Sequence, residues 1–413
     1  MRARPSRDGA ARRLGMRMTP VAAKTIVVQR IEDPAAFQAL REEWDELLAA
    51  SLADSFFLTW EWLYAWWTHL AGDRRLFLLV ARQGGRLVAI APLSLRARRV
   101  AGVLPLRSVE FLGADRLSSD YLDVIVRRGW EADAIPALAQ YLADARLALE
   151  LASVRRAGCA AAALSRALTQ RRWRMWETPT AVCPFIDLSE HTWESYLGTL
   201  ESKPRNDFLR LLKNLTKKFS VRLEPASSEP QRREFMVHLV RLHNLRWQNL
   251  GGSDALHTAD LVAFHDEVSR VTLERGWLRL FVLWLDGQPV ASLYGFRYGR
   301  TFYFVQTGFD PAYGRHAVGL ITVGLTIKSA IAEGAEEYDF LRGDEAYKFR
   351  WAREVRHLAT LEVYPRGAPE LLYRRTQRLT AVAKRIARQT LPRTVIDRVI
   401  AARQRRFQIL ASR

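Results

Sequence analysis

The sequence predicts an α/β (α+β) protein with two tandem, related domains, each built on a mixed and mainly antiparallel sheet, followed by a basic helical tail. Two similar hairpins, a helix that leads into a returning strand, and charge gathered at the chain ends support this fold class. The hairpins are residues 76–96, which turn at Gly-Gly, and residues 278–299, which turn at Asp-Gly. Each follows a helical segment rich in Trp and Leu, so the chain carries an internal repeat.

The repeat sets the domain boundaries that we expect. A first domain takes residues 25–190 and a second takes residues 191–365, while residues 1–24 form a basic, disordered N-terminus and residues 366–413 form the tail. With 413 residues, the chain is long enough for two domains that each bury a core.

The second half shows its elements in a clear order. The hairpin extends into a third strand at 301–309, a turn-rich loop follows at 310–319, and residues 320–334 repeat apolar side chains every three to four positions, as an amphipathic helix does. Residues 336–341 then form a strand, which lies parallel to a neighbour because a helix precedes it. One more strand, residues 357–364, closes the domain.

The first half carries a dense aromatic stripe just before its hairpin. Trp60, Trp62, Tyr64, Trp66 and Trp67 belong to one helical segment. Side chains of this size bury large apolar areas, so we expect the stripe to form core and to face the interface between the two domains.

The formal net charge of +19 lies mostly in the two ends. Residues 1–24 hold seven basic and one acidic side chain, and residues 366–413 hold thirteen and two, so the segment between them is nearly neutral. This placement argues against nucleic acid as a partner. The longest apolar runs are strand-length, and the N-terminus lacks the apolar segment of a secretory signal. We therefore expect a cytoplasmic protein without a transmembrane helix.

Several chemistries lack their residue patterns. No Walker-type or Rossmann glycine loop occurs, which argues against a phosphotransferase or a dehydrogenase. Cys159 and Cys183 have no His placed to activate them, so the two cysteines indicate a reducing compartment rather than disulfides or thiol catalysis. The eight histidines show no metal-ligand spacing, and we expect no metal.

Several segments together resemble one family. FLTWEWLYAWW, GRLVAIAPL and SDYLDVIV in the first half, with PVASLYGFRYGRTFYFVQTGFDPAYGRHAVG and YDFLRGDEAYKFRW in the second, resemble the GNAT-like acetyltransferases of the CelD group, which is associated with cellulose and exopolysaccharide biosynthesis. That group is similar in fold to the FemAB aminoacyltransferases, which also carry two GNAT-like halves. The resemblance covers roughly residues 40–365.

The resemblance implies a binding site for acetyl-CoA or another acyl-CoA. In a GNAT fold the pantetheine arm lies between two parted parallel strands, here 301–308 and 336–341, and the pyrophosphate meets backbone N–H groups at the start of the next helix. The corresponding loop consists of Arg315, His316, Ala317, Val318, Gly319 and Leu320. It keeps one glycine where the usual GNAT loop has two or more. A strand–helix connection without a ligand is the alternative.

Polar and aromatic side chains gather just after the returning strand, in DFLRGDEAYKFRW at 339–351. Ligands bind at the carboxyl ends of parallel strands, and acyl transfer needs a base and donors for the oxyanion. Asp344 and Asp339 are the base candidates, Lys348 and Arg342 are the cations for an oxyanion or an anionic acceptor, and Tyr347 and Trp351 are the rings that stack on a sugar. For Asp339, a buried structural carboxylate is the alternative.

Two further segments are candidates for acceptor contacts. Asp120 and Tyr121 stand in SSDYLDVIV at the start of a predicted strand, where Asp120 alternatively caps a turn. Arg246 and Trp247 stand near the end of a helical segment that two glycines close, where packing of the Trp ring is the alternative.

Together these patterns predict an acyl-CoA-dependent N- or O-acetyltransferase that acts on a saccharide, a lipid-linked saccharide or a small metabolite. Two alternatives remain open. A FemAB-like transferase that uses aminoacyl-tRNA would explain the basic ends, and a non-catalytic scaffold of a polysaccharide synthase would explain the thinned glycine loop.

The tail repeats apolar side chains at helical spacing among many arginines. A basic amphipathic helix binds the headgroup region of anionic membranes, so the tail predicts peripheral contact with the inner face of the membrane. Packing of the tail onto the two domains is the alternative.

Overall fold

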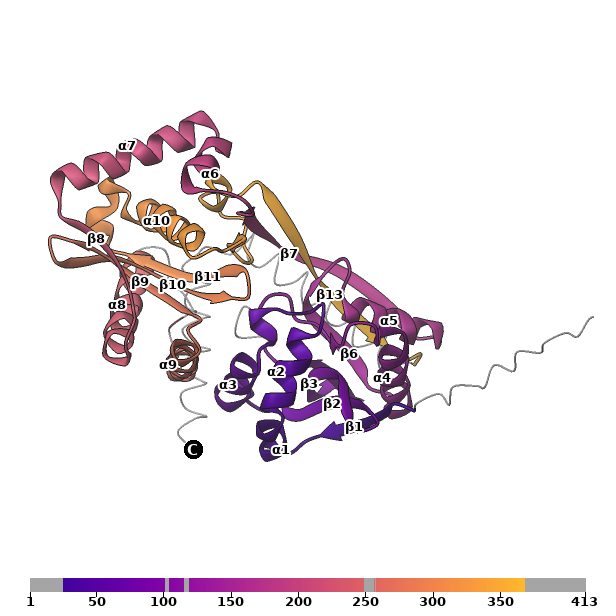
Figure 1. Cartoon of the computed structure of the whole chain (residues 1–413). Helices are drawn as coiled ribbons and strands as arrows, with labels where there is room; N and C mark the ends of the chain where they lie inside the picture. Colours follow the sequence, from indigo (N-terminus) through magenta and orange to yellow (C-terminus); the bar gives the residue numbers. More distant parts are fainter. Residues whose placement is uncertain (1–24, 101–103, 115–118, 249–255, 257, 368–413) are drawn as a thin grey trace, which may run out of the picture.

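The computed structural model describes residues 25–100, 104–114, 119–248, 256 and 258–367. Its strands form one continuous sheet in the order β1-β2-β3-β4-β6-β13-β7-β12-β11-β10-β9-β8, and β5 pairs with β3 (Figure 1). The first half supplies β1 (Val27–Ile31), β2 (Arg75–Gln83), β3 (Arg86–Val100), β4 (Leu104–Phe111), β5 (Ile125–Val126), β6 (Ala148–Arg155) and β7 (Arg174–Asp187). The second half supplies β8 (Val221–Pro225), β9 (Leu278–Leu285), β10 (Gln288–Tyr298), β11 (Thr301–Phe309), β12 (Glu337–Asp339) and β13 (Glu354–Tyr364).

Helices cover the sheet in both halves (Figure 1). They are α1 (Pro34–Ala39), α2 (Arg41–Ala49), α3 (Trp60–Leu70), α4 (Glu131–Ala145), α5 (Ala160–Gln170), α6 (Trp193–Thr199), α7 (Ser202–Lys218), α8 (Glu229–Trp247), α9 (Ala259–Glu274) and α10 (Val318–Ala332). Within the described ranges, none of the helices combines the length and the apolar character needed to cross a membrane. The basic N-terminus and residues 368–413 of the predicted tail lie outside the described residues, so membrane contact through the tail stays a prediction.

The two halves share the order of elements that the internal repeat predicts. β2 and β3 pair as an antiparallel hairpin, and so do β9 and β10. In each half a third antiparallel strand follows, and a helix then leads to a strand parallel to it, so β4 pairs with β6 and β11 pairs with β12. The predicted α/β fold is confirmed, while the boundary at residue 190 stays a prediction.

The last strand departs from the prediction, because β13 does not simply close the second domain. It lies between β6 and β7 of the first half and pairs antiparallel with both. The end of β7 in turn pairs with β12. The two expected sheets are therefore one sheet, and β13 gains a hydrogen-bonded neighbour on each side instead of leaving an open edge.

A second departure concerns residues 119–126, which were expected to begin a strand at Asp120 and Tyr121. The strand is only the two residues of β5, and both side chains lie in the loop before it. Tyr121 has a φ of 58°, in the left-handed region, which a regular strand does not tolerate.

The second half places its helices on opposite faces of the sheet. α7 and α10 lie on one face, and α8 and α9 lie on the other (Figure 1). The predicted apolar stripe of α10 is confirmed, because Val323 and Ile327 are buried in the core and Leu320 and Ile331 pack against the same cluster. The two faces matter for the site, because groups from both faces reach it.

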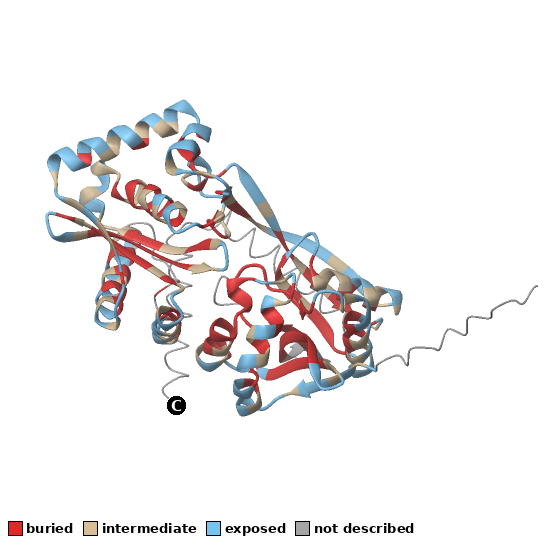
Figure 2. Ribbon diagram, in the orientation of Figure 1, coloured by how far each residue is buried: buried red, intermediate tan, exposed pale blue. Residues whose placement is uncertain are grey.

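Aromatic rings join the two halves. Phe56 stacks on Phe296 of β10 at 4.0 Å between ring centroids, and Trp62 of α3 meets Phe264 of α9 edge to face at 4.9 Å. Trp62 and Trp66 are buried. Figure 2 shows buried positions on the sides of the helices that face the sheet. The aromatic stripe predicted from the sequence thus forms core and interface.

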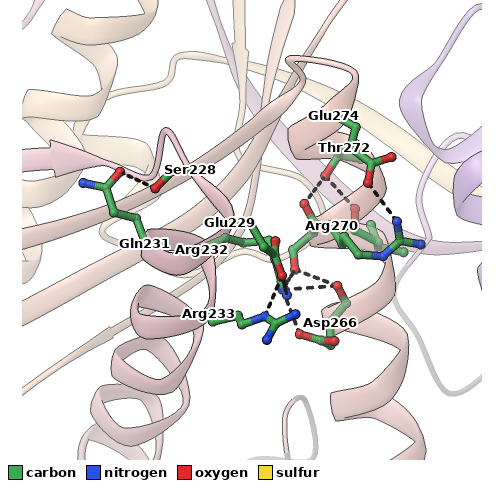
Figure 3. Close-up of polar contacts among 11 residues, drawn as sticks. Ser228, Glu229, Gln231, Arg232, Arg233, Asp266, Arg270, Thr272 and Glu274 are labelled. Carbon is green, nitrogen blue, oxygen red and sulfur yellow. Dashed lines mark hydrogen bonds and ion pairs between the residues drawn. The ribbon is translucent and has the colours of Figure 1, made fainter.

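A buried guanidinium fixes α8 against α9 (Figure 3). The Arg232 side chain is 1% exposed and pairs with Glu229 of its own helix at 2.6 Å. Across the helix pair it donates to Asp266 and to the hydroxyl of Ser269, each at 2.7 Å. Arg233 pairs with the same Glu229 but is 72% exposed. Arg232 lies in the first turn of α8, so its contacts with Asp266 and Ser269 fix the orientation of α8 relative to α9.

Arg232→Met should lower the free energy of unfolding by about 1–3 kcal/mol, because it removes buried charge-assisted hydrogen bonds and leaves the Ser269 hydroxyl without its donor. Arg233→Met is the matched control and should change stability by less than about 0.5 kcal/mol, because exposed ion pairs contribute little. Urea unfolding measures both variants. Equal losses in the two variants would show that burial of Arg232 adds nothing.

Candidate active site

β11 and β12 part after a short stretch of pairing. They pair in parallel only from Thr301 to Tyr303 on β11, opposite Glu337 to Asp339 on β12. β12 ends there, whereas β11 continues to Phe309. A register shift between β10 and β11 also falls at this point, where Val305 is an extra residue on β11. Such a bulge re-aims backbone groups, and bulges are frequent beside active sites.

A cavity of about 230 Å³ occupies the space where the two strands part. Its walls come from β11, the start of α10, the segment after β12 and the end of α8. The lining residues are Arg246, Thr307, Phe309, Gly314, Ala317, Val318, Gly319, Leu320, Val323, Tyr347 and Arg350. Six of them, from Arg246, the 317–320 loop and Tyr347, were predicted as site residues.

The start of α10 opens into this cavity with uncapped backbone donors. Ala317 is the N-cap residue, with a φ of 53° and no side-chain cap, and the first intrahelical hydrogen bond runs from the Ile321 N–H to its carbonyl. The N–H groups of Val318, Gly319 and Leu320 therefore have no acceptor within the helix. Together with the helix dipole, they favour an anion at this end of the cavity.

The rest of the predicted loop lies outside the cavity. The Arg315 side chain is exposed and donates to the ring of His316 at 3.1 Å, and that ring packs against Phe219 after α7. A Cβ at Gly319 would lie 3.0 Å from the Phe309 ring. The single glycine that the loop keeps is therefore the one that lets α10 pack against the end of β11.

Arg246 reaches the cavity because α8 lies directly on β11. A Cβ at Gly308 would come within 2.3 Å of the His243 backbone, so only glycine allows this approach. One turn further, the Arg246 guanidinium lies over the rings of Trp247, Phe309 and Tyr347, at 5.4, 5.2 and 6.0 Å from their centroids.

The Arg246 guanidinium has no hydrogen-bond acceptor or carboxylate partner among the residues that the structure describes. Burial lowers its pKa, and the neighbouring Tyr347 and Glu345 act in the opposite direction. Burial also raises the pKa of the Tyr347 hydroxyl. Tyr347 therefore stays protonated across the physiological range.

Lys348 and Arg342 were predicted to contact an oxyanion or an acceptor, and the structure places both in contacts within the protein. The Lys348 ammonium is buried and donates to the carbonyl oxygens of Leu341 and Arg342 at 3.3 and 2.6 Å, with Glu345 at 3.0 Å. It closes the loop at Gly343, whose φ of 130° suits glycine. The cation thus shapes the segment that carries Tyr347.

Arg342 joins the two halves through Asp120. Its side-chain Nε donates to the buried Asp120 carboxylate at 2.5 Å, and its backbone N–H donates to the other carboxylate oxygen at 2.9 Å. The same guanidinium donates to the Ser119 carbonyl and the Ser153 hydroxyl. The Asp120 carboxylate therefore binds Arg342 and links the first half to the second, instead of capping an exposed turn.

Asp339 and Tyr121 form a second polar link at the junction. The Tyr121 hydroxyl donates to Asp339 at 2.7 Å, and the Leu341 N–H and Arg356 also donate to this carboxylate. Asp339 is fully buried, and burial, with Glu337 next, raises its pKa to about 7. Tyr121, Ser153 and Leu341 all have positive φ, so backbone strain concentrates around this link.

The remaining predicted residues occupy different environments. Asp344 is exposed, and its carboxylate makes no hydrogen bond or ion pair within the described ranges. Trp351 is buried against Phe208 of α7, at 5.2 Å between ring centroids, and against Gly324 of α10. Trp247 lies under the Arg246 guanidinium. The roles of these side chains in binding or catalysis stay predictions.

Sequence reasoning missed five lining residues: Thr307, Phe309, Gly314, Val323 and Arg350. Gly308, inside a strand pattern, was an available signal, because glycine there marks close approach of another backbone. Among the described residues, no group of three or more His, Cys, Asp or Glu side chains is placed to hold a metal ion.

Comparison with known families identifies the domain that carries the cavity. Residues 202–349 match the family described as the acetyltransferase (GNAT) domain. This stretch runs from α7 to the segment after β12 and includes every lining residue except Arg350. The second half therefore contains a GNAT-type acetyltransferase domain. No curated protein matches the chain.

Several solved structures are similar to this chain. The crystal structure of FemX matches with a TM-score of 0.56 and 12% identity, over 77% of this chain and 95% of FemX. A conserved protein of unknown function from Bacteroides thetaiotaomicron matches with a TM-score of 0.48 and 12% identity, over 82% of this chain and 100% of that chain. The C-terminal domain of a putative lysylphosphatidylglycerol synthetase from Agrobacterium fabrum matches with a TM-score of 0.48 and 11% identity, over 82% and 95%. The likeness to FemX shows the fold alone.

The raised pKa of Asp339 predicts a pH-dependent stability. The unfolded carboxyl titrates near 3.8 and the folded one near 7, so between these values the folded protein holds a proton that the unfolded chain has lost. Through this group the free energy of unfolding should fall as the pH rises from about 4 to about 7, by at most about 4 kcal/mol. Asp339→Asn should remove the part of this decrease in the free energy of unfolding that comes from the Asp339 carboxyl.

Urea unfolding measures the free energy of unfolding of the wild type and of Asp339→Asn at several pH values. The difference between the two proteins is compared across the pH range, because other carboxyls such as Asp123 titrate in the same range. A difference that stays constant from pH 4 to pH 7 would contradict a raised pKa at Asp339.

Proposed function

We propose that the protein is an acyl-CoA-dependent acyltransferase whose donor binds in the cavity between β11 and the segment after β12. The single observation that carries this proposal is the helix start of α10 opening, with free N–H groups, into the space where two parallel strands part. The GNAT-type domain over residues 202–349 supports it. Acetyl-CoA is the donor that we propose first.

The arrangement supports a direct transfer. An amine or hydroxyl of the acceptor attacks the thioester carbonyl, and the new tetrahedral oxyanion needs preorganised donors. Backbone N–H groups at the Val305 bulge lie where β11 leaves its partner and are candidates for this role. When the carbon–sulfur bond breaks, the thiolate takes a proton, and we propose the Tyr347 hydroxyl in the cavity wall as its source.

The acceptor must lose a proton in the same reaction. Asp344 is the better base candidate, because its carboxylate is exposed and unpaired within the described chain. Neither carboxylate lines the cavity, but Asp339 is fully buried and enclosed by Tyr121, Arg356 and the Leu341 N–H, so an acceptor cannot reach it. We propose Asp339 as a structural group of the junction.

The acceptor class follows from the family resemblance. We propose a saccharide, a lipid-linked saccharide or a small metabolite, in keeping with the association of the CelD group with cellulose and exopolysaccharide biosynthesis. A non-catalytic scaffold is the contrasting outcome, and donor binding separates the two.

Acetyl-CoA should bind the wild-type protein in isothermal titration calorimetry, and Gly319→Val should weaken that binding at least tenfold. The added side chain would collide with Phe309 and reach into the cavity at the point where the pyrophosphate meets the helix. Gly198→Ala in α6 is the matched control, because a Cβ there meets nothing within 4 Å. Absence of binding to acetyl-CoA and to longer acyl-CoAs in the wild type would reject the proposed function.

A FemAB-like use of aminoacyl-tRNA is the second candidate, and α7 favours it. Lys203, Lys213, Lys217 and Lys218 are exposed on this helix, and the following Phe219 contacts His316 beside the start of α10. A phosphate-rich donor would thus meet positive charge near the cavity. Aminoacyl-tRNA that binds at physiological salt and competes with acetyl-CoA would favour this candidate, whereas binding lost with added salt would mark non-specific attraction.

A further inference from the structure

The cavity contains a cation that makes no hydrogen bond or ion pair with the described residues. Arg246 is half-buried, and within the described ranges its guanidinium lies over the rings of Trp247, Phe309 and Tyr347, with Glu345 as the nearby negative charge. Cation–π attraction offsets part of the lost hydration, but it gives the five N–H donors of the guanidinium no acceptor. A partly desolvated guanidinium whose donors lack acceptors gains free energy when a ligand supplies an anionic group.

The other cations near the site are already engaged or exposed. Lys348 donates to two backbone carbonyls, and Arg342 is bound to Asp120. Arg350 lines the cavity, but it is exposed and lies 4.0 Å from Asp207 of α7. Arg246 is therefore the cation that the described cavity offers to a ligand.

The position of Arg246 separates it from the proposed site of the donor phosphates. It belongs to α8, whereas the free N–H groups belong to α10, and the two helices cover opposite faces of the sheet (Figure 1). The cavity passes between these faces, because its lining includes residues of both helices. A donor held at α10 enters from one face, so a second substrate reaches the thioester from the α8 face.

We propose that Arg246 binds an anionic group, a carboxylate or a phosphate, on the acceptor. The proposal rests on the proposed acyltransferase function and adds the chemical class of its acceptor. The planar guanidinium matches both anions through paired hydrogen bonds, and the rings around it hold it in place while they exclude water. The acceptor is thus an amine or alcohol that carries a negative charge.

The test uses matched pairs of small acceptors that differ in charge. The pairs are glucosamine with glucosamine 6-phosphate, ethanolamine with phosphoethanolamine, and glycinamide with glycine. Each compound is titrated calorimetrically into full-length protein saturated with CoA, so that the α10 site is filled. In at least one pair, the member that carries the phosphate or carboxylate group should bind at least tenfold more tightly than the member that lacks it.

Arg246→Gln should abolish that preference and leave the dissociation constant of acetyl-CoA within threefold of wild type. Arg241→Gln is the control variant, because Arg241 is an exposed residue of the same helix that does not line the cavity. It should bind every compound as the wild type does. Thermal unfolding of both variants checks that they are folded.

Three outcomes would overturn the proposal. The members with a phosphate or carboxylate bind no better than those without it, or Arg246→Gln keeps the preference, or Arg246→Gln weakens acetyl-CoA tenfold, which would assign the cation to the donor phosphates. If CoA itself does not bind, the acyltransferase proposal fails, and the same titrations on the protein without CoA still decide whether Arg246 selects anions.

Discussion

The position of β13 between β6 and β7 constrains the rest of the molecule. β12 lies on one side of β7 and β13 lies on the other, and Phe185 of β7 is paired with Asp339 on one edge and Glu354 on the opposite edge. The chain between them must therefore cross from one edge of β7 to the other. That crossing carries Tyr347, Lys348 and Arg350 past the end of β12 and over the open side of β11. The cavity exists because β12 ends early to allow it.

The polar side chains of this crossing divide between holding the fold and meeting a ligand. Lys348 donates to a backbone carbonyl of the same crossing segment, and Arg342 forms an ion pair with Asp120 of the first half. Both positive charges therefore have partners within the protein. Burial of a cation is tolerated when acceptors surround it, which is the case for both side chains. Arg246, on a helix from the other face, has aromatic rings and no acceptor around it within the part of the chain that the structure describes. The difference in partners separates a structural cation from a binding one.

The periodicity of apolar side chains predicted the individual helices and strands well. It predicted less well which strands pair and which side chains contact each other. The hairpins, α10 and the parallel strand β12 each carry a periodicity that depends on neighbours a few residues apart. The partners of β13 depend on strands some 200 residues earlier, and alternation of side chains does not specify which strand lies alongside. For the same reason the sequence indicated that Arg342 and Asp120 were polar site candidates, but not that they would neutralise each other across the two halves. Arg246 was predicted because it stands near the end of a helical segment that two glycines close, in a chain that resembles the GNAT-like family.

The first half repeats the parting of strands, but its own chain takes much of the space and leaves a smaller cavity of about 80 Å³. β4 and β6 pair in parallel only from Ser108 to Glu110 on β4, and beyond Glu150 β6 keeps β13 as its neighbour but no longer pairs with β4. The loop before β5 lies along the free part, where the Leu122 N–H donates to the Ser153 carbonyl. The Asp123 carboxylate accepts the N–H groups of Ala160 and Ala161, so the start of α5 already has its anion. In the second half, the corresponding donors at α10 have no such carboxylate among the described residues. The two halves thus share one architecture, but only the start of α5 has an acceptor from its own side chains, which is why we propose the donor site at α10 and not at α5.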